Sequence, residues 1–249
     1  MTARLLFFGC TTLLFALSIP IGEGETPASF SNLVEAGSQA PLRGAWTMAE
    51  GGRTRTLVVI DDYLSLTEFD IATKKFYYTT GGTARSDNGQ LSGVVEFHSA
   101  DKSAVGKTYQ WGYTLQSGQL LLTQDGRQSR WTAIDHGSGT LAGNWRITGR
   151  EQNGQMVEMK PGARKTIKLL SGQRFQWAAI NTETGEFFGT GGGRYDFKDG
   201  IYTEHIEFFS RDSSRVGASL SFNGKVEGRN WYHSGKSSRG EPISELWSR

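Results

Sequence analysis

Cysteine and proline are scarce in this chain of 249 residues, which contains one cysteine and five prolines. A single cysteine cannot make a disulfide scaffold or a zinc site built on thiolates. The formal net charge is only +2, from 27 basic and 25 acidic side chains. The chain therefore lacks the basic field that holds nucleic acid by its phosphates, and we expect no nucleic-acid partner.

Glycine and aromatic side chains are abundant, by contrast. The chain has 33 glycines, and aromatic residues make up 12% of it. The aromatic side chains supply the apolar surface that a folded core requires. Many glycines with few prolines are typical of short strands joined by tight turns, so the composition favours an all-β protein.

The first 22 residues have the pattern of a secretory signal. Arg4 supplies a positive charge, and short apolar runs follow at 5–10 and 13–17. These runs are too short for a convincing membrane span, although an uncleaved anchor is the alternative. We expect residues 1–22, with Cys10, to be removed and residues 23–40 to form a flexible leader. The mature chain would then be secreted or periplasmic, without a stable membrane span.

The remaining sequence contains one pattern twice. Leu42-Arg-Gly-Ala-Trp46 returns as Leu141-Ala-Gly-Asn-Trp145, Thr80-Gly81-Gly82 returns as Thr190-Gly191-Gly192, and the segment 95–101 returns as 206–212. Each copy closes on a tryptophan, Trp131 or Trp247. Because the anchors keep their order, we interpret the pattern as duplication of a whole domain. The two domains are predicted at residues 41–136 and 140–249.

Short β-branched or aromatic runs bounded by turn residues recur in both copies, as at 56–60, 109–115, 166–170 and 202–209. Turns are predicted at Ser117-Gly118, Thr184-Gly185, Lys198-Asp199-Gly200 and Asn223-Gly224. The glycines at 189–193 favour a strand bend or bulge over a phosphate cradle, because no helix follows them. The pattern predicts two tandem small antiparallel up-and-down β-barrels, with Trp46 and Trp145 each closing one end of a barrel.

The motif Gly-x-Trp at the entry of each copy, with sequential hairpins behind it, resembles the lipocalin or calycin group. The second copy is similar to uncharacterised secreted lipocalin-like domains of bacteria through four segments: Phe175-Gln-Trp177, Gly191-Gly-Gly-Arg-Tyr195, 202–209 and Glu245-Leu-Trp247. The match covers about residues 140–249, and the first copy only in outline. The resemblance implies a barrel and a possible ligand cavity, but no reaction.

The run 202–209 contains the most informative candidate, Glu204. Side chains alternate along a strand, so Tyr202, Glu204, Ile206 and Phe208 share the more apolar face, which we expect to line the barrel. The counterpart of Glu204 in the first copy is Gly93. A buried carboxylate must be paired, hydrogen-bonded or protonated. Glu204 could therefore hold a ligand, act as an acid or base, or pair with an internal Arg, Tyr or Trp.

His233 shares a face with Trp231 and could be a cavity donor, a general base, a haem ligand, or simply a surface or satisfied core histidine. No resident cofactor or metal is expected, because His205 and Glu207 share a face without a third ligand. A Gly-x-Ser-x-Gly nucleophile motif is absent from the sequence. The predicted ligand-binding residues are Trp177, Tyr195, Tyr202, Glu204, Phe208, Phe222, Trp231 and His233.

Three functions fit these residues. The preferred hypothesis is an exported protein that binds a small, partly apolar molecule in the second barrel. The second is a carbohydrate- or protein-binding module with filled barrels and exposed rings such as Tyr232 or Phe209. The third is an acid–base enzyme, an isomerase or hydrolase, that uses Glu204 and His233. We consider a non-enzymatic role the better supported.

Overall fold

The computed structural model describes residues 41–249, which belong to one compact unit. The predicted signal peptide at 1–22 and the leader at 23–40 lie outside the described residues. The first sheet contains β1 (Gly44–Glu50), β2 (Arg53–Ile60), β3 (Tyr63–Asp70), β4 (Lys75–Thr83), β5 (Arg85–Asp87), β6 (Gln90–His98), β7 (Thr108–Gln116), β8 (Gln119–Gln124) and β9 (Arg127–Asp135). The second contains β10 (Gly143–Gln152), β11 (Gln155–Glu158), β12 (Arg164–Leu170), β13 (Arg174–Asn181), β14 (Glu186–Lys198), β15 (Ile201–Phe209), β16 (Ser219–Glu227), β17 (Asn230–Lys236) and β18 (Pro242–Ser248). Two short 3-10 turns are η1 (Lys102–Ala104) and η2 (Ser213–Arg215).

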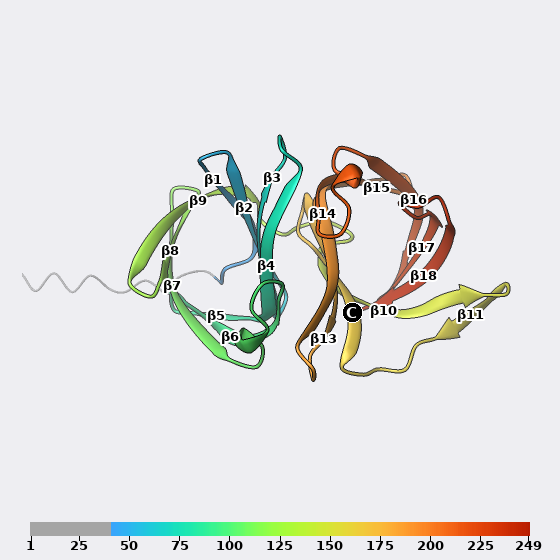
Figure 1. Ribbon diagram of the computed structural model, residues 1–249, viewed down its shortest axis with the longest axis horizontal. Coiled ribbons are helices and arrows are strands. Elements are labelled where there is room, and N and C mark those ends of the chain that lie inside the picture. The colour runs from blue at the N-terminus through green and yellow to red at the C-terminus, as the bar shows by residue number, and fades with distance from the viewer. Residues whose placement is uncertain (1–40) are drawn as a thin grey trace, which may run out of the picture. The chain divides into compact units, whose positions relative to one another are not determined.

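Each sheet closes on itself into an antiparallel barrel of eight strands (Figure 1). Pairing of β4 with β6 closes the first barrel, and pairing of β10 with β18 closes the second. The short strands β5 and β11 pair outside these rings. The predicted fold class, two tandem up-and-down barrels, is confirmed. Closure pairs strand edges that would otherwise promote aggregation.

Three of the four predicted turns lie between strands. Ser117-Gly118 joins β7 to β8 and Asp199-Gly200 joins β14 to β15, all with positive φ, as two-residue hairpins require. Thr184-Gly185 lies between β13 and β14. The turn predicted at Asn223-Gly224 is wrong, because both residues lie inside β16. Gly224 instead permits close packing, since a Cβ there would lie 3.0 Å from the Phe197 ring.

The structure corrects the alignment of the two copies by one residue at the glycine-rich strand. Thr79, rather than Thr80, is the counterpart of Thr190. The backbone N–H of Thr79 donates to the Ser99 hydroxyl, and that of Thr190 donates to the Ser210 hydroxyl, both at 2.9 Å. The sequence match was displaced because the first copy carries two successive threonines.

A β-bulge follows these threonines in both barrels, as expected for the glycine-rich segment. Glu96 and Glu207 are the extra residues, facing Gly82 and Gly193 across the strand pair. A Cβ at either glycine would lie only 2.0 or 2.1 Å from a backbone carbonyl oxygen of the neighbouring strand. The glycines are therefore required for the close approach of backbone that the bulge produces.

The bulge also reverses which side chains face the interior. Strict alternation predicted Phe208 inside and Phe209 outside, and both placements are wrong. Phe208 packs against Phe69 of the first barrel, with ring centroids 4.8 Å apart, whereas Phe209 packs against Trp177 inside its own barrel. The extra residue Glu207 shifts the alternation by one position.

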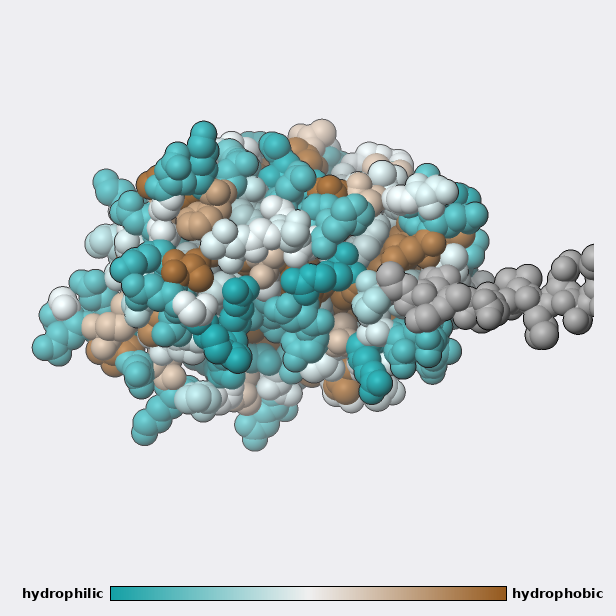
Figure 2. All heavy atoms as spheres, turned by 180° about the vertical axis from the view of Figure 1, so that it is seen from behind, coloured by the Kyte–Doolittle hydropathy of each residue, from teal (hydrophilic) through white to brown (hydrophobic). Residues whose placement is uncertain are grey.

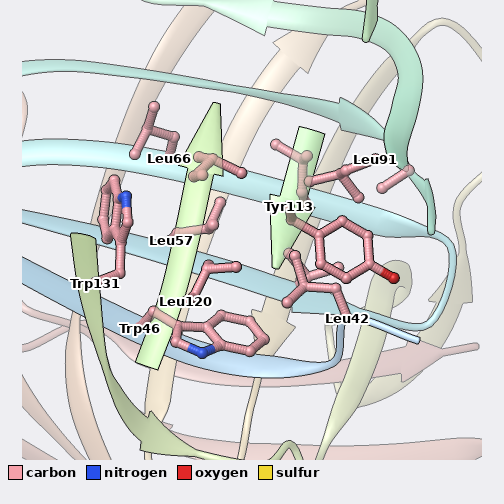
Figure 3. Close-up of a cluster of buried hydrophobic side chains, with 12 residues drawn as sticks. Leu42, Trp46, Leu57, Leu66, Leu91, Tyr113, Leu120 and Trp131 are labelled. Carbon is pink, nitrogen blue, oxygen red and sulfur yellow. The ribbon is translucent and has the colours of Figure 1, made fainter. Parts of the chain in front are cut away.

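Separate apolar clusters fill the two barrels. The cluster in the first barrel includes Trp46 and Trp131 (Figure 3), and the cluster in the second includes Trp145 and Trp247. Trp46 and Trp145 are 3% and 0% exposed, which agrees with their expected role in closing a core. A third cluster contains residues of both barrels, among them Ile60, Phe97 and Leu169.

A buried hydrogen-bond network also joins the two barrels. The Gln176 amide nitrogen donates to the hydroxyls of Thr79 and Thr190 at 2.9 and 3.0 Å. The Thr67 hydroxyl donates to the Gln176 amide oxygen at 2.9 Å. Since Gln176 is only 4% exposed, these bonds satisfy polar groups that water cannot reach.

Candidate functional site

The structure brings most of the predicted site residues together inside the second barrel. Six of them are buried side chains of its interior: Tyr195, Tyr202, Glu204, Phe222, Trp231 and His233. Trp177 is half-buried and packs against the same cluster. Phe208 is the exception and lies between the barrels, for the reason given above.

Glu204 is paired with a lysine that the sequence analysis did not single out. The Lys168 ammonium lies 2.8 Å from Glu204 Oε1, and the two side chains are 5% and 6% exposed. Lys168 comes from β12 and Glu204 from β15, so the ion pair spans the barrel interior. The expectation that the carboxylate would be paired is met, with Lys168 in place of an Arg, Tyr or Trp.

Three aromatic rings surround the Lys168 ammonium. Its nitrogen lies 5.2 Å from the centroid of Tyr202, 5.3 Å from that of Trp231 and 5.0 Å from that of Trp247. The negative faces of aromatic rings stabilise a cation at such distances. Burial, reinforced by the negative charge of Glu204, raises the pKa of the Tyr202 hydroxyl well above its usual value. Tyr202 therefore remains a neutral phenol beside the pair.

His233 and Glu245 form a second polar pair in the same interior. His233 Nδ1 lies 3.5 Å from Glu245 Oε2, and His233 is 2% exposed. Burial, and then the charge of Lys168, lower the pKa of His233, although Glu245 opposes both. Burial also acts to raise the pKa of Glu245, but the adjacent His233 imidazole and then the Lys168 charge outweigh it, so that the pKa is lowered. Near neutral pH, the pair therefore consists of a neutral imidazole and a carboxylate.

Ionisable groups connect this interior with the surface. Arg150 Nη2 lies 3.3 Å from Glu245 Oε1, and the side chains of Arg150 and Glu245 are 51% and 12% exposed. Half-buried side chains of Trp177, Phe209 and Ile243 pack against the interior cluster. They give the barrel a partly exposed apolar edge.

Four buried polar atoms in the interior of the second barrel have no hydrogen-bond partner among the described residues. They are the Tyr202 hydroxyl, Trp231 Nε1 and both ring nitrogens of His233. Buried polar groups are normally satisfied, and each one left without a partner costs about 1–3 kcal/mol. They leave unused hydrogen-bonding capacity in the interior of the second barrel.

The first barrel is an internal control for this chemistry. Trp46 pairs across strands with Leu57, and the equivalent Trp145 pairs with Lys168, so Leu57 is the counterpart of Lys168. By the same registers, Gly93, Leu122 and Ser129 are the counterparts of Glu204, His233 and Glu245. We call Lys168, Glu204, His233 and Glu245 the ionisable layer. The same fold closes without charge at these positions.

Sequence reasoning missed Lys168 and Glu245 for an identifiable reason. Lys168 lies within an apolar run, and Glu245 stands next to Leu246 and Trp247, so neither has a distinctive motif. The repeat did contain a usable signal. An alignment of the two copies places both charges where the first copy has Leu57 and Ser129, which lie on its interior face.

Three other residues were candidates for a metal site or a stacking surface: His205, Tyr232 and Phe209. His205 contacts Asp196 and Ser219 on the outer surface, and the described residues include no group of three or more potential metal ligands. Tyr232 is 39% exposed, as a stacking ring would require, but Phe209 is half-buried inside the barrel. Within residues 41–249, no helix is long and apolar enough to cross a membrane.

Comparison with protein-family models, with curated proteins and with solved structures found no match for this chain. The geometry of the site is therefore the basis for the function proposed below.

Proposed function

We propose that the second barrel binds a small, partly apolar molecule whose polar group contacts the ionisable layer. The apolar part of the ligand would lie against Trp177, Phe209 and Ile243 at the partly exposed edge. The polar part would accept a hydrogen bond from Trp231 Nε1 and exchange one with His233 Nε2. Such a combination of an apolar lining and a few convergent polar groups is the usual form of a small-molecule site.

The observation that carries this proposal is the contrast between the two barrels. Burying a charged pair is costly, and replacing it with apolar side chains of similar volume is often neutral or stabilising. In the first barrel, Leu57 and Gly93 stand in place of the Lys168–Glu204 pair, and Leu122 stands in place of His233. The second barrel keeps four ionisable side chains at the same level, which folding alone does not require. Ligand recognition supplies a reason for keeping them.

The acid–base alternative has less support from the geometry. It assigned a joint role to Glu204 and His233, but Glu204 is paired with Lys168, and His233 faces Glu245. A carboxylate neutralised by a buried ammonium is a poor general base. We retain binding as the function, in an exported protein whose lipocalin-like character is an inference from sequence alone.

The proposal is tested by native mass spectrometry of the full purified chain, followed by solvent extraction and identification of any released molecule. We expect a bound molecule of a few hundred daltons, about the size that such pockets enclose. The double variant Lys168→Met/Glu204→Leu replaces the ion pair with apolar side chains of similar volume. It should fold and lose the molecule.

His205→Ala is the matched control, because His205 lies on the same strand as Glu204 but on the outer face. This variant should retain the bound molecule. If the double variant is folded and binds the molecule as the wild type does, the ionisable layer is not the binding site. If no molecule is bound by the wild type, even after incubation with a cell extract, the proposal fails.

A further inference from the structure

The first barrel has a large opening at one end, which we call the first mouth. Its volume is about 1270 Å³. Leu66 and Trp131 line its base and belong to the apolar cluster of the barrel. Within that cluster the two side chains lie close to each other and away from Leu42 and Tyr113 (Figure 3). Met48 and Tyr78 contribute to its wall. The first mouth is therefore an open cavity with an apolar base.

A buried carboxylate organises the charges at this mouth. Glu68 Oε2 accepts from Arg55 Nε at 2.6 Å, and Glu68 Oε1 accepts from Arg53 Nη1 at 2.8 Å. The Glu68 side chain is only 3% exposed, whereas those of Arg53 and Arg55 are 52% and 39% exposed. Burial acts to raise the pKa of Glu68, but hydrogen bonds from Arg55 and Arg53 outweigh it and lower the pKa. The carboxylate is ionised at neutral pH and orients both guanidinium groups.

Two guanidinium groups share this one carboxylate, so the triad has a net charge of +1. The other charged side chains that line the first mouth balance in number, Arg127 and Arg130 against Glu50 and Asp125. Arg55 bonds to Glu68 through Nε, which leaves its terminal nitrogens as further donors. Arg55 lines the first mouth, and a smaller adjoining pocket of about 240 Å³ is lined by Arg53 and Arg55 together. The triad therefore presents fixed donors beside an apolar base.

We propose that the first mouth is a second ligand site, which binds a monocarboxylate with an apolar body. The carboxylate of the ligand contacts the Arg55 guanidinium, with Arg53 beside it, and the apolar body lies over Leu66 and Trp131. A guanidinium fork matches a carboxylate in shape, and a single negative charge compensates the single excess charge of the triad.

The second barrel again provides the internal comparison. Equivalent bulges follow Glu68 in β3 and Ala179 in β13, which makes Ala179 the counterpart of Glu68. Thr166 is the counterpart of Arg55, because each lies two residues before the partner of the entry tryptophan. The Glu–Arg pairing is thus specific to the first barrel, and the two barrels are expected to select different ligands.

Isothermal titration calorimetry of the full chain with 2-naphthoate tests this site. The neutral analogue 2-naphthylmethanol keeps the apolar body, and acetate keeps only the head group. We expect 2-naphthoate to bind at least about tenfold more tightly than either analogue, since a hydrogen bond to a charged group contributes about that factor. Equal affinity for 2-naphthoate and 2-naphthylmethanol would refute the role of the triad.

Arg55→Gln should weaken 2-naphthoate binding about tenfold or more. Arg130→Gln is the matched control. It removes the same charge from the rim of the same cavity, but Arg130 bonds to Gln119 and takes no part in the triad. If both variants weaken binding equally, only the general electrostatic field attracts the ligand, and the proposed contact is wrong.

Glu68→Gln separates charge from geometry. This variant removes one negative charge, and its amide has only one acceptor oxygen where the carboxylate has one for each arginine. The proposal predicts weaker binding of 2-naphthoate, whereas attraction by net charge alone predicts tighter binding. Lys168→Met/Glu204→Leu, in the other barrel, should leave 2-naphthoate binding unchanged. A loss of binding in that variant would place the probe in the second barrel and overturn the proposal.

Discussion

The Lys168–Glu204 ion pair leads to a quantitative prediction about stability. Both side chains are about 95% buried, and their charged atoms are 2.8 Å apart. Removing one partner of such a pair leaves an uncompensated buried charge, which costs about 3–5 kcal/mol. Lys168→Met leaves the Glu204 carboxylate buried without its partner, and is therefore expected to lower the free energy of unfolding by about that amount.

The two single variants should not be equivalent. Glu204→Leu leaves the Lys168 ammonium among three aromatic rings at 5.0–5.3 Å, and these continue to stabilise the cation. We expect Glu204→Leu to cost about 1–2 kcal/mol less than Lys168→Met, since a desolvated cation–π contact is worth about 2 kcal/mol. In the double variant both charges are absent, so its stability should be equal to or greater than that of the wild type.

Urea denaturation at neutral pH, followed by circular dichroism, measures the free energies of unfolding of the wild type, the two single variants and the double variant. These four values make up a double-mutant cycle. The expected result is a coupling of about 3 kcal/mol or more between the two positions. Single variants that each cost less than about 1 kcal/mol would show that the pair behaves like a solvated surface pair. A double variant less stable than either single variant would refute the reasoning, because packing would then outweigh charge.

Three further predictions concern His233 and the contacts between the two barrels. The lowered pKa of His233 means that the unfolded chain binds more protons near pH 6.5, so stability should fall as the pH drops through that region. His233→Leu should flatten the dependence of the urea midpoint on pH between about 7.5 and 5.5, the remainder arising from His98, whose pKa burial also lowers. Gln176→Leu should lower the free energy of unfolding by about 1–3 kcal/mol, because the hydroxyls of Thr67 and Thr79 lose a buried hydrogen-bond partner. A lower midpoint of thermal unfolding is the expected measurement. Phe208→Ala should lower the free energy of unfolding by about 3–5 kcal/mol, and thermal unfolding followed by tryptophan fluorescence should show lower midpoints for both barrels together. Destabilisation of the second barrel alone would contradict the contact between Phe208 and Phe69.

The architecture was predictable because its signals are local and occur twice. Alternating side chains, glycine turns and two entry tryptophans all indicate hairpins that close around an apolar centre. The errors occur where backbone geometry departs from simple alternation. The bulge at Glu207 moved Phe208 out of the barrel. Gly224 was predicted in a turn but lies within β16, where it packs closely against the Phe197 ring.

The candidate site was predictable in part. Glu204 stood out because a carboxylate interrupted an apolar face, but the sequence offered no rule for choosing its partner. Lys168 lies 36 residues away along the chain, and only the register of the closed barrel brings it to 2.8 Å. Long-range pairing of this kind depends on strand order and bulges, which single-sequence patterns do not specify.

The two barrels place their buried charges at different levels of the same scaffold. The first keeps Leu57 and Leu122 where the second has Lys168 and His233, and the second keeps Ala179 where the first has Glu68. Each charged position thus has an uncharged counterpart that folds within the same chain. Since buried charge lowers stability unless it is paired, two separate sets of paired charges imply two separate demands on the protein. This divergence is expected if the duplicated barrels recognise different molecules, the second in its interior and the first at its mouth. If duplication had served stability alone, one uncharged core would have been sufficient for both copies.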